Sequence, residues 1–517
     1  MKRIFSLKRL SVLLAVLIVT LLCSGCEDLQ EQQEEKIKEQ ISQAEELLEQ
    51  QEYQDAQEIL EQLLEEYPED SRAYGLLSDL FLTQNDWKSA RDILEQGIKS
   101  AETPGSLKEK QESLSKKIAE QESAAAVLQP AVTYWGSTYF WKYSSASVEA
   151  QGAAPEYPFR SDAENQLICR GEDGKEQVLY TGPGSGDVVI FQDRLYFSAG
   201  EQGMGCVPPE GGEVSFTPGA SPVGCDLSSE VLLLATQQGE TPLLETMGKD
   251  GNRAIIAEGT LLSFTDGLVY FQSPGEESGR RASLCSVKPD GSDETLLAQV
   301  MLYSGEGGVR QVQAIEDTVY FSHGRYRAGD GVFEEGSLFR VQADGSGFSR
   351  LFSISSPVFS IYLDGETPML RYQANGGESR LTEIPMGSPS SVCLNLDSGT
   401  SSNSPMPCGP IGVPFTDGKG NLWLYPDRSG TPTQLLSSSE GYLSTGNLPA
   451  DISQDGASWN TVSQPCISGG YLYFTAIEST YDHAGDTSGG AAGFRRVSSR
   501  AMRKSLSTGE TELLYSY

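Results

Sequence analysis

The sequence is poor in the residues and patterns that carry most enzyme chemistry. Only two of its 517 residues are histidines, and it contains no G-x-S-x-G, no H-E-x-x-H and no P-loop. Serine triads, zinc proteases and nucleotide-binding enzymes each depend on one of these patterns. We therefore predict that the chain is not an enzyme and has no catalytic residue, no metal site and no cofactor.

Positive charge is also scarce. The chain has 38 Lys and Arg against 72 Asp and Glu, a formal net charge of −34. Nucleic acid binding depends on neutralising phosphates with basic side chains, so we exclude nucleic acid as a partner. The abundant carboxylates could supply the pair that a glycosidase needs, but an acidic composition produces such pairs by chance.

Cysteine is present without the spacing of a metal cluster. Nine cysteines occur; two of them, Cys23 and Cys26, lie in the first 26 residues, and none of the remaining seven forms a C-x-x-C pair. The other seven are Cys169, Cys206, Cys225, Cys285, Cys393, Cys408 and Cys466. One disulfide is possible in an exported chain, and the odd count leaves at least one thiol unpaired.

Residues 1–26 contain an apolar run, Ser11 to Leu22, behind a basic start. This run is too short to span a membrane comfortably and ends in small residues, as a signal peptide does. The ending Ser24, Gly25 and Cys26 resembles the lipobox of bacterial lipoproteins, although Cys23 stands where leucine is usual. The resemblance implies cleavage before Cys26, a lipid on Cys26, and anchoring at the extracytoplasmic face of the cell membrane.

Residues 27–125 have the apolar spacing of helices and contain a repeat. The stretch from Tyr53 to Gln62 returns from Trp87 to Gln96, an offset of 34 residues that is the tetratricopeptide period. Ala56 and Ala90 occupy the small contact position, so this part resembles tetratricopeptide repeats. The resemblance implies a peptide-binding groove, and the alternative is a rigid helical stalk.

Residues 126–130 are predicted to be a linker, and residues 131–517 repeat a hairpin. Its clearest copy runs from Leu284 to Leu297 around Asp290 and Gly291, and ends in two apolar residues. An apolar-Tyr-Phe strand precedes many copies. Its Tyr residues are Tyr139, Tyr196, Tyr270, Tyr320 and Tyr473. A unit of roughly 40 to 50 residues predicts the blades of a β-propeller.

Counting hairpins gives eight blades, with seven as the alternative, because the copies near Gly211 and Gly430 are degenerate. The Tyr-Phe strand followed by the Asp-Gly hairpin resembles bacterial propellers related to the low-density-lipoprotein-receptor-like β-propeller. That resemblance implies a binding or scaffolding module at the cell envelope, with no catalytic residue to inherit.

Four connections after the Tyr-Phe strand are expanded, and long loops tend to be functional. They are Lys142 to Asn165, Ser273 to Ser283, His323 to Gly336 and Ala476 to Gly493. Their aromatic and charged side chains are the candidate binding residues. These are Tyr157, Arg160, Arg280, Arg281, His323, Arg325, Tyr326, Arg327, Tyr481, Asp482 and His483, with Tyr143 among the further aromatics.

These features together predict a lipid-anchored, extracytoplasmic binding or scaffold protein that captures a protein or glycan ligand on the loop-bearing face of its propeller. One alternative is an envelope enzyme that acts on glycans through paired carboxylates. Another is an assembly factor for envelope proteins that acts through the helical repeats.

Overall fold

The computed structural model describes residues 32–144, 164–184, 186–265, 267–273, 281–301, 307–326, 333–374, 391–404, 406, 408–409, 411–416, 421–443, 458–481 and 494–516. Contacts divide the chain into two units, Met1–Gln121 and Glu122–Tyr517. Cys26 and the lipobox lie outside the described residues. Within them, no helix is both long and apolar enough to cross a membrane.

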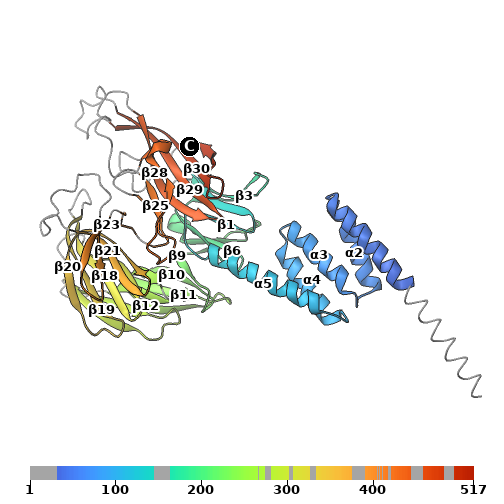
Figure 1. Ribbon diagram of the computed structural model, residues 1–517, viewed down its shortest axis with the longest axis horizontal. Helices are drawn as coiled ribbons and strands as arrows, with labels where there is room; N and C mark the ends of the chain where they lie inside the picture. The colour runs from blue at the N-terminus through green and yellow to red at the C-terminus, as the bar shows by residue number, and fades with distance from the viewer. Residues whose placement is uncertain are drawn as a thin grey trace, which may run out of the picture. The chain divides into compact units, whose positions relative to one another are not determined.

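The first unit is helical, as predicted (Figure 1). Residues 32–49 form a helix, followed by α2 (Tyr53–Glu66), α3 (Ser71–Thr83), α4 (Trp87–Ser100) and α5 (Gly105–Ala125). The small contact residues Ala56 and Ala90 are fully buried. Gly97 interrupts the apolar pattern because a Cβ there would lie 2.6 Å from the Tyr74 ring, so glycine lets α4 approach α3 closely.

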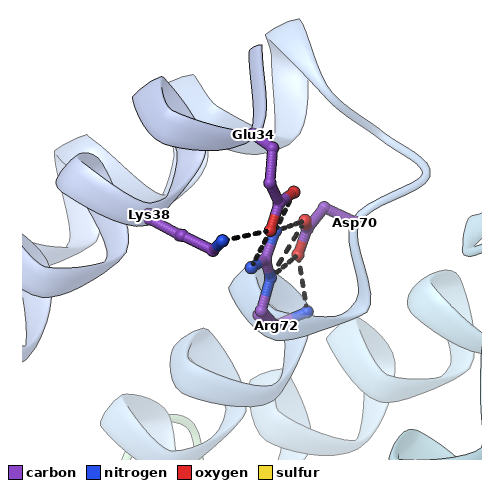
Figure 2. A network of polar contacts seen from close by, with 4 residues as sticks. All are labelled: Glu34, Lys38, Asp70 and Arg72. Carbon is purple, nitrogen blue, oxygen red and sulfur yellow. Dashed lines mark hydrogen bonds and ion pairs between the residues drawn. The ribbon is translucent and has the colours of Figure 1, made fainter. Parts of the chain in front are cut away.

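A charged network joins the first two helical pairs (Figure 2). Arg72 donates to Glu34 at 2.9 Å and forms an ion pair with Asp70 at 2.5 Å, and Lys38 lies 3.5 Å from Glu34. Asp70 also caps α3 by accepting from the Arg72 backbone N–H at 2.8 Å. Burial opposes the ionised form, but the hydrogen bonds from Arg72 lower the pKa of Asp70.

The described part of the second unit consists of sheets whose strands follow chain order and pair antiparallel, except for the parallel pair β27 and β28, which confirms the propeller fold (Figure 1). Four of them have four strands each. They are β1 (Ala131–Tyr134), β2 (Ser137–Lys142), β3 (Glu164–Arg170) and β4 (Glu176–Pro183); β5 (Val188–Phe191), β6 (Arg194–Ser198), β7 (Met204–Val207) and β8 (Ser215–Thr217); β9 (Ala220–Asp226), β10 (Val231–Gln238), β11 (Thr241–Met247) and β12 (Arg253–Glu258); and β13 (Thr260–Thr265), β14 (Leu268–Ser273), β15 (Arg281–Val287) and β16 (Thr295–Met301).

Three further sheets complete the unit. A seven-stranded sheet contains β17 (Gly307–Ile315), β18 (Thr318–Tyr326), β19 (Phe333–Gln342), β20 (Ser349–Asp364), β21 (Thr367–Ala374), β22 (Ser391–Asn395) and β23 (Ser401–Ser404). The next contains β24 (Phe415–Thr416), β25 (Leu422–Leu424) and β26 (Thr433–Leu436). The last contains β27 (Tyr442–Leu443), β28 (Ser458–Ser468), β29 (Tyr471–Tyr481), β30 (Phe494–Ser505) and β31 (Thr511–Ser516).

The seven-stranded sheet divides within β20. Its first half pairs with β19 up to Ile354, and its second half pairs with β21 continuously from Phe359 onward. Ile354 itself also pairs with Ala374 of β21, and the register shifts between Ile354 and Phe359. The long strand β20 is therefore the last strand of the group β17 to β20 and also the first strand of the group β20 to β23. The blade number of eight or seven stays a prediction.

The Asp-Gly hairpins share one turn geometry. In the hairpin at residues 288–292, the Gly291 N–H donates to the Lys288 carbonyl at 2.8 Å, and the Lys288 N–H donates to the Ser292 carbonyl at 3.0 Å. Gly291 has φ +78°, and Asp290 accepts from the Ser292 N–H at 2.9 Å. This is a type I turn followed by a left-handed glycine and a bulge. Asp supplies the side-chain acceptor, and Gly supplies the positive φ.

The paired apolar residues after each turn mark a second bulge. In six strands one residue of the apolar pair has no partner across the sheet, and it is always Leu or Ile. These residues are Leu179, Ile256, Leu297, Leu351, Leu435 and Leu514. A bulge breaks the alternation of a strand. Leu297 is consequently buried, at 2% exposure, whereas the preceding Leu296 is 53% exposed.

Residues 126–130, predicted to be a linker, are part of the second unit. The Ala126 carbonyl accepts from the Cys225 N–H at 3.1 Å, and Gln129 forms a bridge with Val188. Ala126 also packs in the core cluster between the second and third sheets. The prediction of a linker is therefore wrong, because the alanine-rich stretch is apolar enough to be buried here.

Candidate functional site

The first and last sheets of the second unit meet along a seam. The Thr133 N–H donates to the Ser468 hydroxyl at 2.6 Å, and the hydroxyls of Thr138 and Tyr473 lie 3.1 Å apart. Phe140 stacks on Tyr515, with ring centroids 5.7 Å apart. Residues more than 330 positions apart in the sequence thus pack together, which brings the end of the repeat array back to its beginning.

A pocket of about 40 Å³ lies at this seam. Its walls come from the start of β1, the end of β2, and the middle of β29, β30 and β31, and most of its wall residues are aromatic or aliphatic. They are Pro130, Ala131, Phe140, Trp141, Tyr143, Tyr473, Phe474, Thr475, Ala501, Met502, Leu514 and Tyr515, and we call this the seam pocket. Its size admits the end of one apolar side chain.

The seam pocket lies at the base of the first predicted binding loop. Tyr143 follows β2 directly, and its hydroxyl accepts from the Gly186 N–H at 3.2 Å. The Asn165 side chain, on β3, is fully buried; it accepts from the Ser144 N–H at 3.0 Å and donates to the Gly184 carbonyl at 2.7 Å. These bonds fix both ends of the connection between β2 and β3, so Tyr143 is held in place as a wall of the pocket.

One wall residue has an unused hydrogen-bond donor. Trp141 is 2% exposed, and its indole N–H has no acceptor among the described residues. Its ring contacts Tyr180 and Phe197 edge to face, at centroid distances of 6.2 and 5.6 Å. A buried donor without an acceptor is rare in folded proteins and calls for a missing partner.

Charged groups lie near the same seam. Lys142 Nζ is 5.5 Å from the Tyr515 ring centroid and 3.6 Å from Glu176. Asp187 is half-buried beside the backbone contact of Tyr143, and burial raises its pKa. In the described part of the chain its carboxylate has no hydrogen bond or ion pair. Burial also raises the pKa of the Cys466 thiol to about 12, and the charge of Asp187 adds to this shift.

The predicted binding residues fall into three groups. Six lie outside the described residues: Tyr157, Arg160, Arg280, Arg327, Asp482 and His483. Tyr326 and Tyr481 end β18 and β29, and their side chains are likewise outside the description. Three are described. Arg281 is exposed at the start of β15, Arg325 is half-buried on β18, and His323 is buried on β18 at 6% exposure.

Strand pairing extends into two of the predicted loops. The connection predicted from His323 to Gly336 is narrowed to residues 327–332, because β18 continues to Tyr326 and β19 begins at Phe333. The connection predicted from Ala476 is shortened likewise, since β29 continues to Tyr481. His323 pairs with Ser337 and contacts the Phe339 ring edge to face at 6.2 Å. Its prediction as a loop residue is therefore wrong, because strand pairing extends past the Tyr-Phe signature.

All seven cysteines of the second unit are free thiols. Several face the tyrosine of a Tyr-Phe strand directly across the sheet, as Cys169 faces Tyr139 and Cys206 faces Tyr196. These thiols are parts of the strand pattern. That thiols at strand positions such as Cys285 belong to the core could be predicted, but cysteine spacing alone does not identify the cross-strand partner.

Comparison with known protein families identifies the helical repeats. A tetratricopeptide repeat family model matches residues 47–105, which confirms the predicted repeats. Comparison with curated protein sequences finds no match.

Several solved structures resemble the chain at low similarity. A puromycin hydrolase is 12% identical with a TM-score of 0.34, over 77% of this chain and 55% of that chain. The β-propeller domain of the Trilobed protease from Pyrococcus furiosus is 10% identical with a TM-score of 0.29, over 75% of this chain and 98% of that one. Saccharomyces cerevisiae Sqt1 is 11% identical with a TM-score of 0.30, over 75% and 88%. The chain thus spans about half of the first of these proteins, and these likenesses do not assign an activity.

Proposed function

We propose that this chain is a lipid-anchored binding or scaffold protein of the bacterial cell envelope, which captures a protein ligand at the seam pocket of its propeller. The anchor is supported by the signal-like leader that ends in Ser24, Gly25 and Cys26. The scaffold role is supported by the combination of tetratricopeptide repeats with a propeller, two architectures built to present binding surfaces.

The observation that carries the proposal is the seam pocket, whose walls are mostly aromatic or aliphatic. Aromatic walls bind apolar side chains and proline rings. An apolar side chain of a protein ligand therefore matches this pocket better than a glycan, whose surface is rich in hydroxyl groups.

The proposal is tested by selecting peptides from a displayed random library on the full chain. We expect enriched peptides that share an apolar or aromatic residue and bind saturably. Incubating the same peptides with the chain and weighing them by mass spectrometry tests the enzyme alternative. Cleavage products would show that the chain is a peptidase and would contradict a binding role.

The seam pocket is tested with a variant that fills it. Thr475 lines the pocket and is 6% exposed, so Thr475→Met places a larger side chain in the space while keeping the strand. We expect at least tenfold weaker peptide binding. Thr241→Met, on the half-buried start of β11 away from the seam, is the matched control and should leave affinity unchanged. Equal affinity of both variants would place the binding surface elsewhere.

A further inference from the structure

A buried arginine lies in the seven-stranded sheet far from the seam pocket. Arg371 is on β21 and is 4% exposed. Its guanidinium lies between two aromatic rings, 4.6 Å from the Tyr362 centroid and 5.0 Å from the Tyr425 centroid. Its Nη1 donates to the Tyr425 hydroxyl. The two tyrosines come from β20 and from the residue after β25, so the guanidinium joins two neighbouring sheets.

Among the described residues, no carboxylate lies in an ion pair with this guanidinium. In the described part of the chain Arg371 forms no ion pair, and its Nε–H has no acceptor. Arg253, which is partly buried, has by contrast an acidic partner in Glu245 at 2.5 Å. Arginine is almost never fully buried without a partner, because an uncompensated charge in the protein interior costs several kcal/mol. Two tyrosine faces attract a cation, but each contributes only about 1 to 2 kcal/mol.

The surrounding side chains do not supply the missing negative charge. Cys393 is the cross-strand neighbour of Arg371 and accepts from the Tyr362 hydroxyl at 3.3 Å. The Cys408 thiol donates to the Arg371 carbonyl at 3.3 Å and to the Val358 carbonyl at 3.5 Å. Burial raises the pKa of Cys408 to about 12, so this thiol stays neutral at physiological pH. Tyrosine hydroxyls in the same cluster are also neutral, since burial raises the pKa of Tyr425 to about 12.

We propose that Arg371 is an anion-binding residue whose ligand is a single carboxylate. Nη1 is occupied by Tyr425, which leaves Nε and Nη2, the edge of a guanidinium that binds the two oxygens of a carboxylate in parallel. The tyrosine rings hold the guanidinium plane in a fixed orientation. Because Arg371 is nearly inaccessible, the carboxylate enters through local separation of the strands around β21. The carboxylate belongs either to a small organic acid or to a peptide ligand.

The test follows the Nε–H resonance of Arg371 by NMR in the full chain labelled with ¹⁵N-arginine. Arg371→Lys assigns the resonance by its disappearance, and Tyr425→Phe, which keeps the ring, assigns it independently if the first variant does not fold. Sodium acetate is titrated against acetamide, which has the same shape without the charge. A second pair of probes is a short blocked peptide ending in a free carboxylate and the same peptide ending in an amide.

We expect a saturable shift of the Arg371 resonance with acetate and none with acetamide. A shift with the carboxylate-ended peptide alone would also support the site and identify a peptide as the source of the carboxylate. Arg281, which is exposed, is the internal control and should show only a weak, non-saturating response. No saturable shift with either carboxylate probe, or an equal shift with acetamide or the amide peptide, would overturn the proposal.

Discussion

At the scale of single residues, the hairpin glycines differ in what surrounds them. All adopt a positive φ that other residues rarely take, but only some also face a neighbouring backbone. A Cβ at Gly345, with φ +81°, would lie 2.4 Å from the Leu296 carbonyl oxygen of the previous sheet. Gly509, with φ +75°, has nothing within 4 Å. The turn at Gly345 therefore packs directly against the backbone of the previous sheet, whereas the turn at Gly509 has no neighbouring atoms at this point.

This difference predicts a graded effect on stability. Gly509→Ala should lower the free energy of unfolding by about 1 kcal/mol, the cost of a left-handed alanine. Gly345→Ala should lower it by more, because backbone must also move. Urea unfolding of the full chain measures both, and Gly105→Ala in α5, which has no positive φ and open space, is the control. Equal losses for the two hairpin variants would contradict the contact between sheets.

A second residue-scale prediction concerns Asp187. Burial raises its pKa above the ordinary 3.8, so the folded chain binds the proton more tightly than the unfolded chain does. Its stabilising contribution is fully present below pH 3.8 and is lost as the pH rises through the folded pKa. Asp187→Asn removes this loss and should therefore stabilise the chain at pH 7. Thermal unfolding at pH 7 and at acidic pH checks it, since no gain should remain at the acidic pH. Destabilisation at pH 7 would show that Asp187 has a favourable partner.

At the scale of elements, two glutamine side chains on β17 connect this strand to β20. Gln311 on β17 donates to the Phe359 carbonyl at 2.9 Å and accepts from the Phe359 N–H at 3.1 Å. Gln313 donates to the same carbonyl at 3.0 Å and accepts from the Ile361 N–H at 3.0 Å. These side-chain amides serve the backbone of β20 as a neighbouring strand would.

Replacing these amides should therefore leave strand groups without partners. The double variant Gln311→Leu, Gln313→Leu should cost about 1 to 3 kcal/mol in unfolding free energy, because the Phe359 and Ile361 backbone groups lose their bonds. Gln238→Leu, at an exposed position of β10, is the matched control and should stay within about 0.5 kcal/mol. A double variant as stable as the control would mean that water replaces the amides without loss.

The elements also show how far sequence patterns reach. The Asp-Gly turns and Tyr-Phe strands were predictable, because turn chemistry and period-2 alternation are local. The bulge at Leu297 and the burial of His323 were not, because both depend on which residue of the neighbouring strand lies opposite. The walls of the seam pocket were missed except for Tyr143, since they combine strands that are adjacent only after the array closes. Phe140 and Tyr473 were nevertheless visible as members of repeated Tyr-Phe strands.

At the scale of the whole molecule, the chain carries two modules that could each bind a protein. The helical repeats and the propeller each contain a buried tryptophan that reports on its own module. Trp87 lies on α4 and is 8% exposed, and Trp141 lies at the seam pocket. The two residues therefore offer a direct way to ask which module holds the ligand.

The most direct measurement is ¹⁹F NMR of the full chain labelled with 5-fluorotryptophan. Trp141→Phe and Trp87→Phe assign the two resonances, and a peptide selected on the chain is then titrated. We expect the Trp141 resonance to shift saturably, with the apparent affinity of the peptide, while the Trp87 resonance stays unchanged. A shift of Trp87 without a shift of Trp141 would contradict the account, because the ligand would then bind the helical repeats and not the seam pocket.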